Sequence, residues 1–438
     1  MFGLDSREGT PLRRSVFAGR GWLVDERTVA VGRRSLVALA ALNFFLADAR
    51  DGLGPFLDAF LATRGWSPFA LGAIATVGGL IGLAVTPLFG ALVDGTRYKR
   101  ALVAVPVIVV TAVGLATLVA PTPAIVWIGQ VGTAVVGAVI GPALMGLTLG
   151  LIGPRLFGRQ VARNEFWNHA GNVVSLAAVF IAVSLYGEHA IITLMIVTAI
   201  GAVVAAMAID PARIDHDAAR GLDEAGDSAK PSGLRVLVKT PGLLVLALVL
   251  LMFHFGNAPM SRLVAQQFAI ELGTPFRTTA IITGVSQVAM IAVAVLAPLM
   301  IRRFGLATVL LVALCALPVR GLIAGTNSGF WTIFPVQALD GVGAGLIGIA
   351  TPIAVERLLA GSGRFNVGFA AVMTMQGVGA SLSNVVAGSV VSGYGYQASH
   401  LLSAAIAVVA VAIFLRFRRS IAPERSDATD AASATAAR

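Results

Sequence analysis

The sequence predicts an all-α membrane protein with 12 transmembrane helices, arranged as two pseudo-symmetric halves of six helices each. Three observations support this prediction: long apolar runs, basic residues confined to one side of those runs, and an internal repeat. Of the 438 residues, 57% are hydrophobic and 12% are charged, whereas soluble domains carry about 25% charged residues. This composition excludes an ordinary soluble globular protein.

The apolar runs have the length and continuity of membrane-spanning helices. A helix needs about 20 apolar residues to cross a bilayer, and backbone in lipid must satisfy its own hydrogen bonds. The runs do not alternate with a period of two, so we expect helices and not barrel strands. The predicted spans are 35–61, 69–93, 101–121, 123–153, 166–186, 189–209, 241–270, 279–301, 306–326, 330–355, 366–391 and 398–417.

The lysine and arginine residues predict the orientation of these spans. Of the 32, 27 lie in the two tails, in the even-numbered connections or at the helix ends beside them. Basic residues favour the cytoplasmic side, so both termini are expected in the cytoplasm. This distribution explains the net charge of +10, and no nucleic-acid partner is expected. Arginine outnumbers lysine, and alanine and glycine are abundant, which indicates a GC-rich bacterial genome and hence the bacterial inner membrane.

An internal repeat divides the chain into halves. A shift of 209 residues places Phe44 on Phe253 and Asp48 on Asn257 and aligns whole predicted spans. Two parallel six-helix halves permit a site between them that is exposed to each side of the membrane in turn. The predicted division is a tail at 1–34, halves at 35–209 and 241–417, a cytoplasmic linker at 210–240 and a tail at 418–438.

The first predicted span carries an acidic stripe. Asp48, Asp51 and Asp58 share one helical face with Pro55, which weakens the helix there, whereas Arg50 points away. Ionisable groups inside a span are costly and are therefore functional candidates. Asp48 and Asp51 are candidate proton-coupling residues, and Arg50 is a candidate cavity residue. A structural ion pair between helices is the alternative.

The fifth predicted span opens with a polar face. Glu165, Asn168, His169 and Asn172 have the spacing 0, 3, 4 and 7, which places them on one side of a helix. Glu165 is a further proton-coupling candidate, and the other three are candidates for the inner mouth of a cavity. A polar helix start at the membrane interface is the alternative.

The seventh predicted span, which the repeat aligns with the first, carries His254, Asn257 and Ser261 on one face. These three are candidate cavity residues near the middle of the membrane. Arg262 follows, and its long side chain, near the outer end of the span, is expected to reach the interface.

Three further kinds of polar residue lie within predicted spans. Arg320 is expected to reach the outer interface like Arg262, and Asp340 is a candidate ion-pair partner for either arginine. Four glutamines are possible cavity residues that hydrogen bonds between helices explain equally well: Gln130, Gln287, Gln337 and Gln376. A cavity rich in carboxylates favours cationic or neutral cargo, while Arg50 and Arg262 leave anionic cargo open.

The connection after the second predicted span runs Gly90-Ala-Leu-Val-Asp94-Gly-Thr-Arg97-Tyr-Lys99-Arg100. This pattern, Gly-x-Leu-x-Asp followed by basic residues, resembles the corresponding loop of the major facilitator superfamily (MFS). The resemblance implies the MFS fold of two parallel halves and transport by alternating access. It also implies that Asp94 bonds a neighbouring helix end and closes an intracellular gate with the basic residues beside it.

The chain also departs from patterns of that superfamily. Trp127 stands where the arginine of an Arg-x-x-Gln pattern ending at Gln130 is usual, and Gly95 stands where a basic residue is usual. The fifth span lacks the Gly-Pro-rich pattern typical of drug–proton antiporters. These departures weaken an assignment as a drug exporter.

The leading functional hypothesis is a monomeric secondary active transporter that couples protons to the efflux of a small organic solute. Uptake of a small metabolite by proton symport is an alternative, and a non-transporting membrane sensor or scaffold is another. The expected partners are the solute, protons and the lipid bilayer. The sequence shows no nucleophile–base pairing and no cluster of metal ligands, so neither an enzyme, a cofactor nor a metal is expected.

Overall fold

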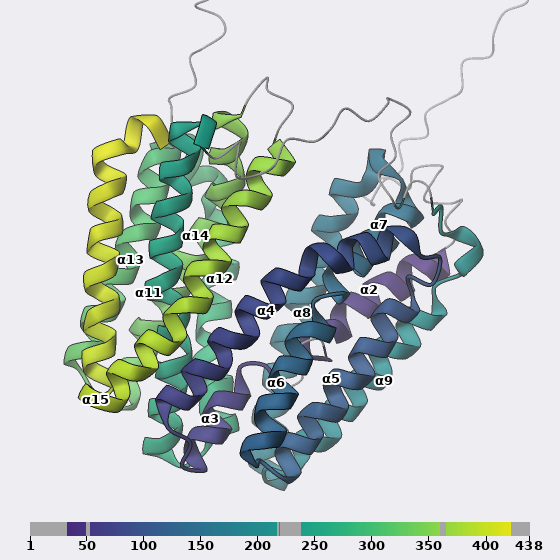
Figure 1. Ribbon diagram of the computed structural model, residues 1–438, viewed down its shortest axis with the longest axis horizontal. Helices are drawn as coiled ribbons and strands as arrows, with labels where there is room; N and C mark the ends of the chain where they lie inside the picture. Colours follow the sequence, from purple (N-terminus) through teal and green to yellow (C-terminus); the bar gives the residue numbers. More distant parts are fainter. Residues whose placement is uncertain (1–32, 50–52, 217–218, 220–237, 360–364, 422–438) are drawn as a thin grey trace, which may run out of the picture.

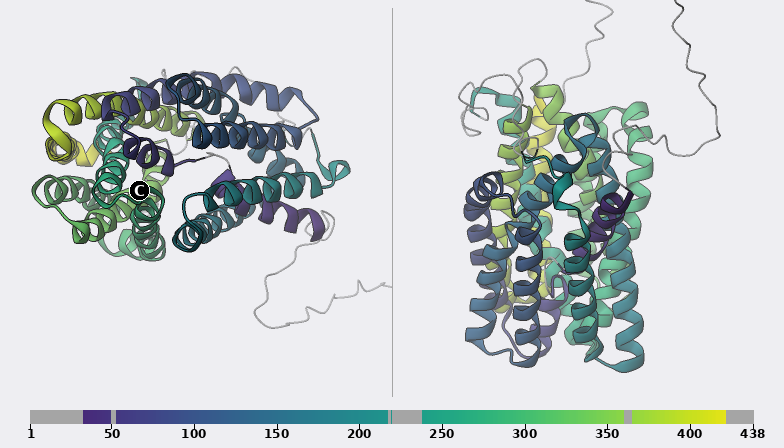
Figure 2. Two further views of the ribbon diagram at one scale, coloured as in Figure 1. Left: turned by 90° about the horizontal axis from the view of Figure 1, so that it is seen from below. Right: turned by 90° about the vertical axis from the view of Figure 1, so that its right-hand side faces the viewer.

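The computed structural model describes residues 33–49, 53–216, 219, 238–359 and 365–421. The described residues form helices and no β-strand. These helices make two bundles that lie side by side, one from each half of the sequence (Figure 1; Figure 2, left). The predicted all-α fold is confirmed.

The first bundle contains eight helical segments that make up six spans. Its helices are α2 (Arg33–Ala49), α3 (Phe56–Thr63), α4 (Pro68–Gly95), α5 (Ala101–Val119), α6 (Pro123–Gly137), α7 (Ile140–Ile152), α8 (Pro154–Tyr186) and α9 (Ala190–Ala208). Helix α2 packs against α8 and α9, and α6 packs against α4 and α5. Two helices begin with the same signal: the hydroxyl groups of Ser67 and Thr122 cap α4 and α6, and proline follows each.

The second bundle is built from longer helices. They are α11 (Pro241–Leu272), α12 (Pro275–Phe304), α13 (Leu306–Thr326), α14 (Ile333–Leu358) and α15 (Phe365–Ile421), with the 3₁₀ turn η3 (Phe330–Thr332) before α14. Helix α15 contains two predicted spans, because the chain reverses direction at Gly395 (Figure 1). Gly395 has φ 85°, a left-handed conformation that glycine adopts without a Cβ penalty.

The helix boundaries explain why the number of predicted spans differs from the number of long apolar helices in the structure. Ten helices of the described chain are long and apolar enough to cross a membrane. One of these ten is α15 with its two spans, and the first predicted span is divided into α2 and α3. Helix α8 begins at Pro154 and not at 166, because its first turns are polar and extend beyond the apolar run.

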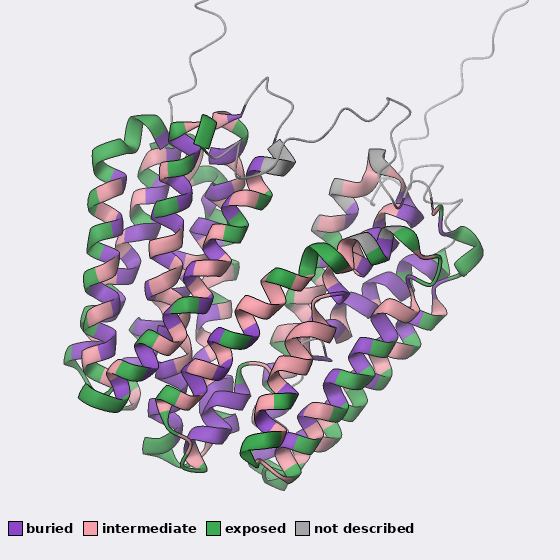
Figure 3. Ribbon diagram, in the orientation of Figure 1, coloured by how far each residue is buried: buried purple, intermediate pink, exposed green. Residues whose placement is uncertain are grey.

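Apolar side chains cover the outside of both bundles. Val105 and Ile108 of α5 and Val408 of α15 are exposed, although each is strongly apolar. On such peripheral helices, exposed and buried positions alternate around the helix (Figure 3). Exposed apolar surface of this extent is expected where lipid is the solvent.

The bundles touch at one end and diverge towards the other. The contacts join α4 to α15, α3 to α11 and α12, and α8 to α12. We call the end at which α3 meets α11 and α12 the closed end, and the end at which α2 begins and α15 terminates the open end (Figure 1). At the closed end the ring of Phe276 lies 5.9 Å from that of Phe56 and 5.8 Å from that of Phe60.

Helices α4 and α15 approach so closely that their backbones meet. A Cβ atom at Gly72 would overlap the backbone carbonyl of Asn384. Nearby, the Thr76 hydroxyl donates to the carbonyl of Ser381 at 2.7 Å and accepts from the N–H of Val385 at 3.0 Å. Ser381 and Val385 are the i and i+4 partners of one helical turn, so Thr76 bonds both members of one backbone pair of α15.

Candidate functional site

A cavity of about 820 Å³ lies between the two bundles. Small-molecule sites usually have volumes of about 300–1,000 Å³. Its described lining comes from both halves: α3, α4 and α6 on one side, and α11, α12, α14 and α15 on the other. The cavity is therefore the candidate site, and its two walls differ in chemistry.

The wall from the second bundle is polar. On α12, Thr279, Thr283 and Gln287 line the cavity at intervals of four residues, which places them on one helical face. Helix α14 adds Gln337 and Asp340, which are also about one turn apart. This wall concentrates hydrogen-bonding side chains on two neighbouring helices that pack against each other.

The wall from the first bundle is built mostly from small and apolar residues. Gly78, Gly79 and Gly82 of α4 line the cavity, and α6 contributes Gln130 and Thr133. Gly79 packs against Ser381 of α15 and so also serves the close approach of the bundles, whereas Gly78 and Gly82 lie against α6 of the first bundle. This wall provides room and apolar contact with few polar groups.

An ion pair joins the two bundles inside the cavity. Asp58 of α3 accepts hydrogen bonds from Nε and Nη2 of Arg262 in α11, the latter at 2.6 Å. Asp58 is 6% exposed, and the side chain of Arg262 is 30% exposed. Both residues line the cavity. A two-point arginine–carboxylate pair is a strong and directional contact, and this one holds the closed end together.

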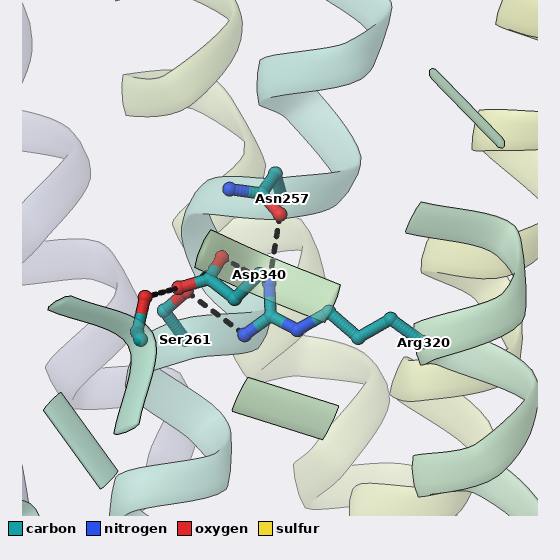
Figure 4. A network of polar contacts seen from close by, with 5 residues as sticks. Asn257, Ser261, Arg320 and Asp340 are labelled. Carbon is teal, nitrogen blue, oxygen red and sulfur yellow. Dashed lines mark hydrogen bonds and ion pairs between the residues drawn. The ribbon is translucent and has the colours of Figure 1, made fainter. Parts of the chain in front are cut away.

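A second ion pair lies wholly inside the second bundle (Figure 4). Nη1 of Arg320 donates to Oδ1 of Asp340 and to Oδ1 of Asn257, both at 2.7 Å, and Nη2 donates to the Ser261 hydroxyl at 3.0 Å. The Ser286 hydroxyl donates to the other oxygen of Asp340 at 2.8 Å. The Asp340 carboxylate is thus shared between the network and the cavity wall.

This network corrects the expectation that Arg262 and Arg320 reach the outer interface. Arg320 is fully buried, with 0% of its surface exposed, because it lies on the face of α13 that packs into the bundle and because Asp340 supplies the counter-charge. Arg262 turns towards Asp58 and not towards the interface. The suggested partnership of Asp340 with one of these arginines is confirmed for Arg320.

Asp48 lies in the interior of the first bundle. It is half-buried and accepts hydrogen bonds from the hydroxyls of Ser175 at 2.8 Å and Thr198 at 2.9 Å. Asp48 is not among the cavity-lining residues. Arg50 and Asp51 lie outside the described residues.

The polar face of the fifth predicted span is divided in the structure. The Asn168 amide donates to the carbonyl of Asn43 in α2 at 3.4 Å, and the Asn172 amide donates to Asn168 at 3.5 Å. Glu165 and His169 are exposed. The two asparagines therefore lie at the contact of α8 with α2, and none of the four residues lines the cavity.

Two of the three residues predicted on one face of the seventh span share a partner in the structure. Asn257 and Ser261 both accept hydrogen bonds from Arg320, and Ser261 also lines the cavity. His254 is half-buried beside the ring of Phe253, with 5.4 Å between the ring centres. It joins neither the Arg320 network nor the cavity lining.

The loop between α4 and α5 anchors two helix ends. Lys99 is fully buried, and its ammonium group donates to the carbonyls of Val93 at 2.9 Å and Thr96 at 2.8 Å, at the end of α4. Arg100 donates to the carbonyls of Met207 and Ile209, where α9 ends. Cations at helix C-termini are favourable.

The other residues predicted for this loop have simpler surroundings. Arg97 is exposed, and Gly90 lies in α4 with open space where a Cβ would be. The side chain of Asp94 lies outside the described part of the chain. The expected role of Asp94 at a gate therefore stays a prediction.

The sequence interpretation missed Thr279 and Thr283 of the cavity wall. Their four-residue spacing with Gln287 was the available signal, since hydroxyl and amide groups on one face of an apolar span are unusual. Of the four glutamines, the structure places Gln130, Gln287 and Gln337 at the cavity. Among the described residues there is no group of three or more His, Cys, Asp or Glu that fits a metal ion.

Two six-helix bundles with a cavity between them are the architecture of one class of membrane transporters. The family model described as "MFS_1 like family" matches residues 36–406, and the chain belongs to this family. Its members belong to the major facilitator superfamily, as the loop after α4 indicated. The chain is a multi-pass membrane transporter and not an enzyme.

The relatives agree with this assignment. Two proteins of Mycobacterium tuberculosis, from strains CDC 1551 and H37Rv, are each described as an uncharacterised MFS-type transporter. Each is 35% identical over 393 residues, which cover 88% of this chain and 94% of the relative.

Solved structures share the fold at low sequence identity. The nucleoside transporter NupG has a TM-score of 0.69 and 17% identity, with 88% of this chain and 98% of that chain covered. A bacterial homologue of the lysosomal transporter Spinster has a TM-score of 0.64 and 15% identity, with 90% and 97% covered. A bacterial homologue of the iron transporter ferroportin has a TM-score of 0.63 and 16% identity, with 89% and 98% covered.

Proposed function

We propose that this MFS transporter works by alternating access and couples the efflux of a small organic solute to the entry of protons. The observation that carries the proposal is the ion pair between Asp58 and Arg262, which lines the cavity and joins the two bundles at the closed end. The chain supplies both walls of the cavity, which supports function as a monomer.

The ion pair links proton binding to the opening of the closed end. Separation of the bundles there requires Asp58 and Arg262 to part, and an uncompensated buried carboxylate is unfavourable. A proton on Asp58 removes that penalty. Arg262 is 30% exposed, so its charge stays solvated when Asp58 becomes neutral. Protonation therefore favours the state in which the closed end opens.

The positions of the basic residues indicate which side of the membrane the cavity faces. The open end is where α2 begins and α15 terminates (Figure 1), and the basic residues predict that this end faces the cytoplasm. In this arrangement the cavity is closed towards the outside, and a cytoplasmic solute reaches it first. A proton that binds Asp58 from the outside while the closed end is open is displaced when the ion pair with Arg262 re-forms, and it leaves through the open end to the cytoplasm.

Asp48 is the second candidate for proton coupling. Its two hydroxyl partners, on α8 and α9, tie it to the interior of the first bundle and not to the cavity. Protonation of Asp48 would change the packing of α2 against these helices. Asp51, Glu165 and the cavity candidates Arg50, Asn168, His169 and Asn172 stay predictions beside it.

Proton movement in proteoliposomes tests this function. Purified protein is reconstituted around an internal pH dye, and cationic, neutral and anionic solutes are added to wild type and to the variants Asp58→Asn and Asp48→Asn. We expect a solute-dependent pH change in wild type that falls to the level of protein-free liposomes in Asp58→Asn. Glu188→Gln is the control, because Glu188 forms an exposed ion pair with Arg64 and neither residue lines the cavity.

Each outcome assigns the mechanism. Opposite movement of solute and protons supports efflux by antiport, whereas movement in the same direction means uptake by symport. Solute flux without any pH change refutes proton coupling. A pH change that survives in Asp58→Asn but is lost in Asp48→Asn moves the coupling site to the first bundle.

A further inference from the structure

We propose that the transported solute is an uncharged polar molecule with both hydrogen-bond donors and acceptors. Its polar edge binds Thr279, Gln287 and Gln337 on the wall formed by α12 and α14. This inference rests on the proposed transport function and narrows it to a substrate class.

The three side chains present polar atoms that the protein does not satisfy. Oγ1 of Thr279, Oε1 of Gln287 and Nε2 of Gln337 are buried, and no described protein group bonds to them. Thr279 and Gln337 are each only 1% exposed, and all three residues line the cavity. Buried polar atoms in folded proteins nearly always have a partner. The three atoms have almost no exposed surface in this conformation, but their residues line the cavity, so the geometry points to a solute there that bonds them after a rotation of each side chain.

The chemistry of these groups defines what they recognise. A glutamine amide offers donors and an acceptor, and a threonine hydroxyl offers one donor and accepts as well. A carboxamide, a ureide or a set of hydroxyls presents complementary donors and acceptors side by side. A quaternary ammonium ion offers no such donor, and a carboxylate offers only acceptors.

The charges around the cavity argue against an ionic solute. The charged residues among the described lining are Asp58, Arg262 and Asp340. Asp58 is paired with Arg262, and Asp340 is paired with Arg320. A permanent ion would therefore enter a cavity without a free counter-charge, and burial of an unpaired charge is strongly unfavourable. The sequence alone had favoured cationic or neutral cargo, and the pairing narrows this to neutral cargo.

The opposite wall sets the shape of the solute. On the first-bundle wall, Gly78 and Gly82 of α4 line the cavity beside apolar side chains such as that of Leu83. A flat or apolar face packs against such a surface. The expected solute thus has a polar edge and a compact body, at a size that about 820 Å³ accommodates together with water.

Binding of charge-matched probes to the full-length protein in detergent tests this inference. One series is nicotinamide, nicotinate and 1-methylnicotinamide, which are neutral, anionic and cationic at similar size. A second pair is N-acetylglucosamine and glucosamine. We expect the neutral member of at least one series to raise the melting temperature in a saturable manner, with its charged counterparts at least about tenfold weaker.

Leucine variants locate the binding groups. We expect Gln337→Leu and Gln287→Leu each to weaken binding of the neutral probe at least about tenfold, since a bond to a buried polar group is lost. Gln376→Leu is the matched control, because Gln376 is buried in α15 but does not line the cavity. Gln287 is only partly buried, so its variant keeps the test valid if Gln337→Leu does not fold.

Three results would overturn the inference: tighter binding of a charged counterpart, wild-type affinity in both leucine variants, or no binding by any neutral probe. The measurement uses no proton gradient. Neutral-probe binding without a pH change in liposomes would therefore refute proton coupling while the substrate class stands.

Discussion

The two halves of the transporter hold their buried charges differently. The sequence repeat aligns Asp48 of the first half with Asn257 of the second. Asp48 is held by two hydroxyl groups, from Ser175 and Thr198, whereas Asn257 accepts a hydrogen bond from Arg320, the partner of Asp340. Matching helices thus carry different polar networks. The repeat conserves the positions of the spans, and the chemistry of each half is set by substitutions inside them.

The same contrast appears in the cavity walls. The first half contributes glycines from α4 and the carboxylate Asp58, and the second half contributes Thr279, Gln287 and Gln337. On the mechanism proposed above, the first half carries the gating carboxylate and the second half carries most of the recognition. Variants of the two halves should therefore differ in stability as well as in binding.

The largest difference is expected at the buried ion pair. Asp340→Leu leaves Arg320 fully buried without its counter-charge, which should reduce the free energy of unfolding by about 3–5 kcal/mol. In the first half, Asp48→Leu removes two hydroxyl hydrogen bonds at a half-buried site and should reduce it by about 2 kcal/mol. Thermal and denaturant unfolding in detergent measure both.

A double variant separates the pair from the packing around it. Asp340→Leu with Arg320→Met removes both charges, so most of the lost stability should return. If the double variant is as unstable as Asp340→Leu alone, the lost stability does not come from the unpaired charge. It then comes from the lost hydrogen bonds of the surrounding hydroxyls and Asn257. An Asp48→Leu variant that is less stable than Asp340→Leu would reverse the comparison of the halves.

After the second span of each half the difference in lost stability is expected to be smaller, and here the first half should lose more. Lys99→Ala removes two bonds from a fully buried ammonium group and should reduce the free energy of unfolding by about 2 kcal/mol. Arg303, in the last turn of α12 before the corresponding connection of the second half, is exposed, so Arg303→Ala should change the free energy of unfolding by less than about 0.5 kcal/mol. Equal effects in unfolding experiments would mean that the two loops have equivalent roles.

The contact between the halves should respond more weakly. Thr76→Val keeps the side-chain volume but removes the hydroxyl that bonds α15, at an expected cost of about 1 kcal/mol in unfolding free energy. Thr86→Val is the control, because the Thr86 hydroxyl bonds only a carbonyl of its own helix. Identical melting temperatures for the two variants would exclude a stabilising role for the Thr76 hydroxyl.

The smallest effect is expected at the surface of the first half. Arg64 and Glu188 form an exposed ion pair at 3.6 Å, and Arg64→Ala should change the free energy of unfolding by less than about 0.5 kcal/mol. A larger loss that persists at high salt would show that the packing of Arg64 over the Phe60 ring, at 4.6 Å, matters more than its charge.

The sequence predicted the spans well because apolar length is a local property. The weakened turn at Pro55 was also predictable, and the structure places the end of α2 and the start of α3 on either side of it. The partnership of Asp58 with Arg262 was not predictable, because helical spacing gives the face of a residue but not the helix opposite. The burial of Arg320 was not predictable for the same reason, because which face of α13 packs into the bundle depends on helices that are distant in the sequence.

The contact of Thr76 with α15 affects how easily the two halves can part and come together again. The groups that it bonds, the carbonyl of Ser381 and the N–H of Val385, are the natural partners of each other within one helical turn. When the halves part, these two groups can bond each other within the helix, and the released hydroxyl can bond water. The contact can thus be exchanged for an equivalent one in the separated state, so neither state is trapped by broken backbone bonds. A contact between α4 and α15 that is replaced without loss of hydrogen bonds suits a carrier that must open and close many times with little net change in free energy.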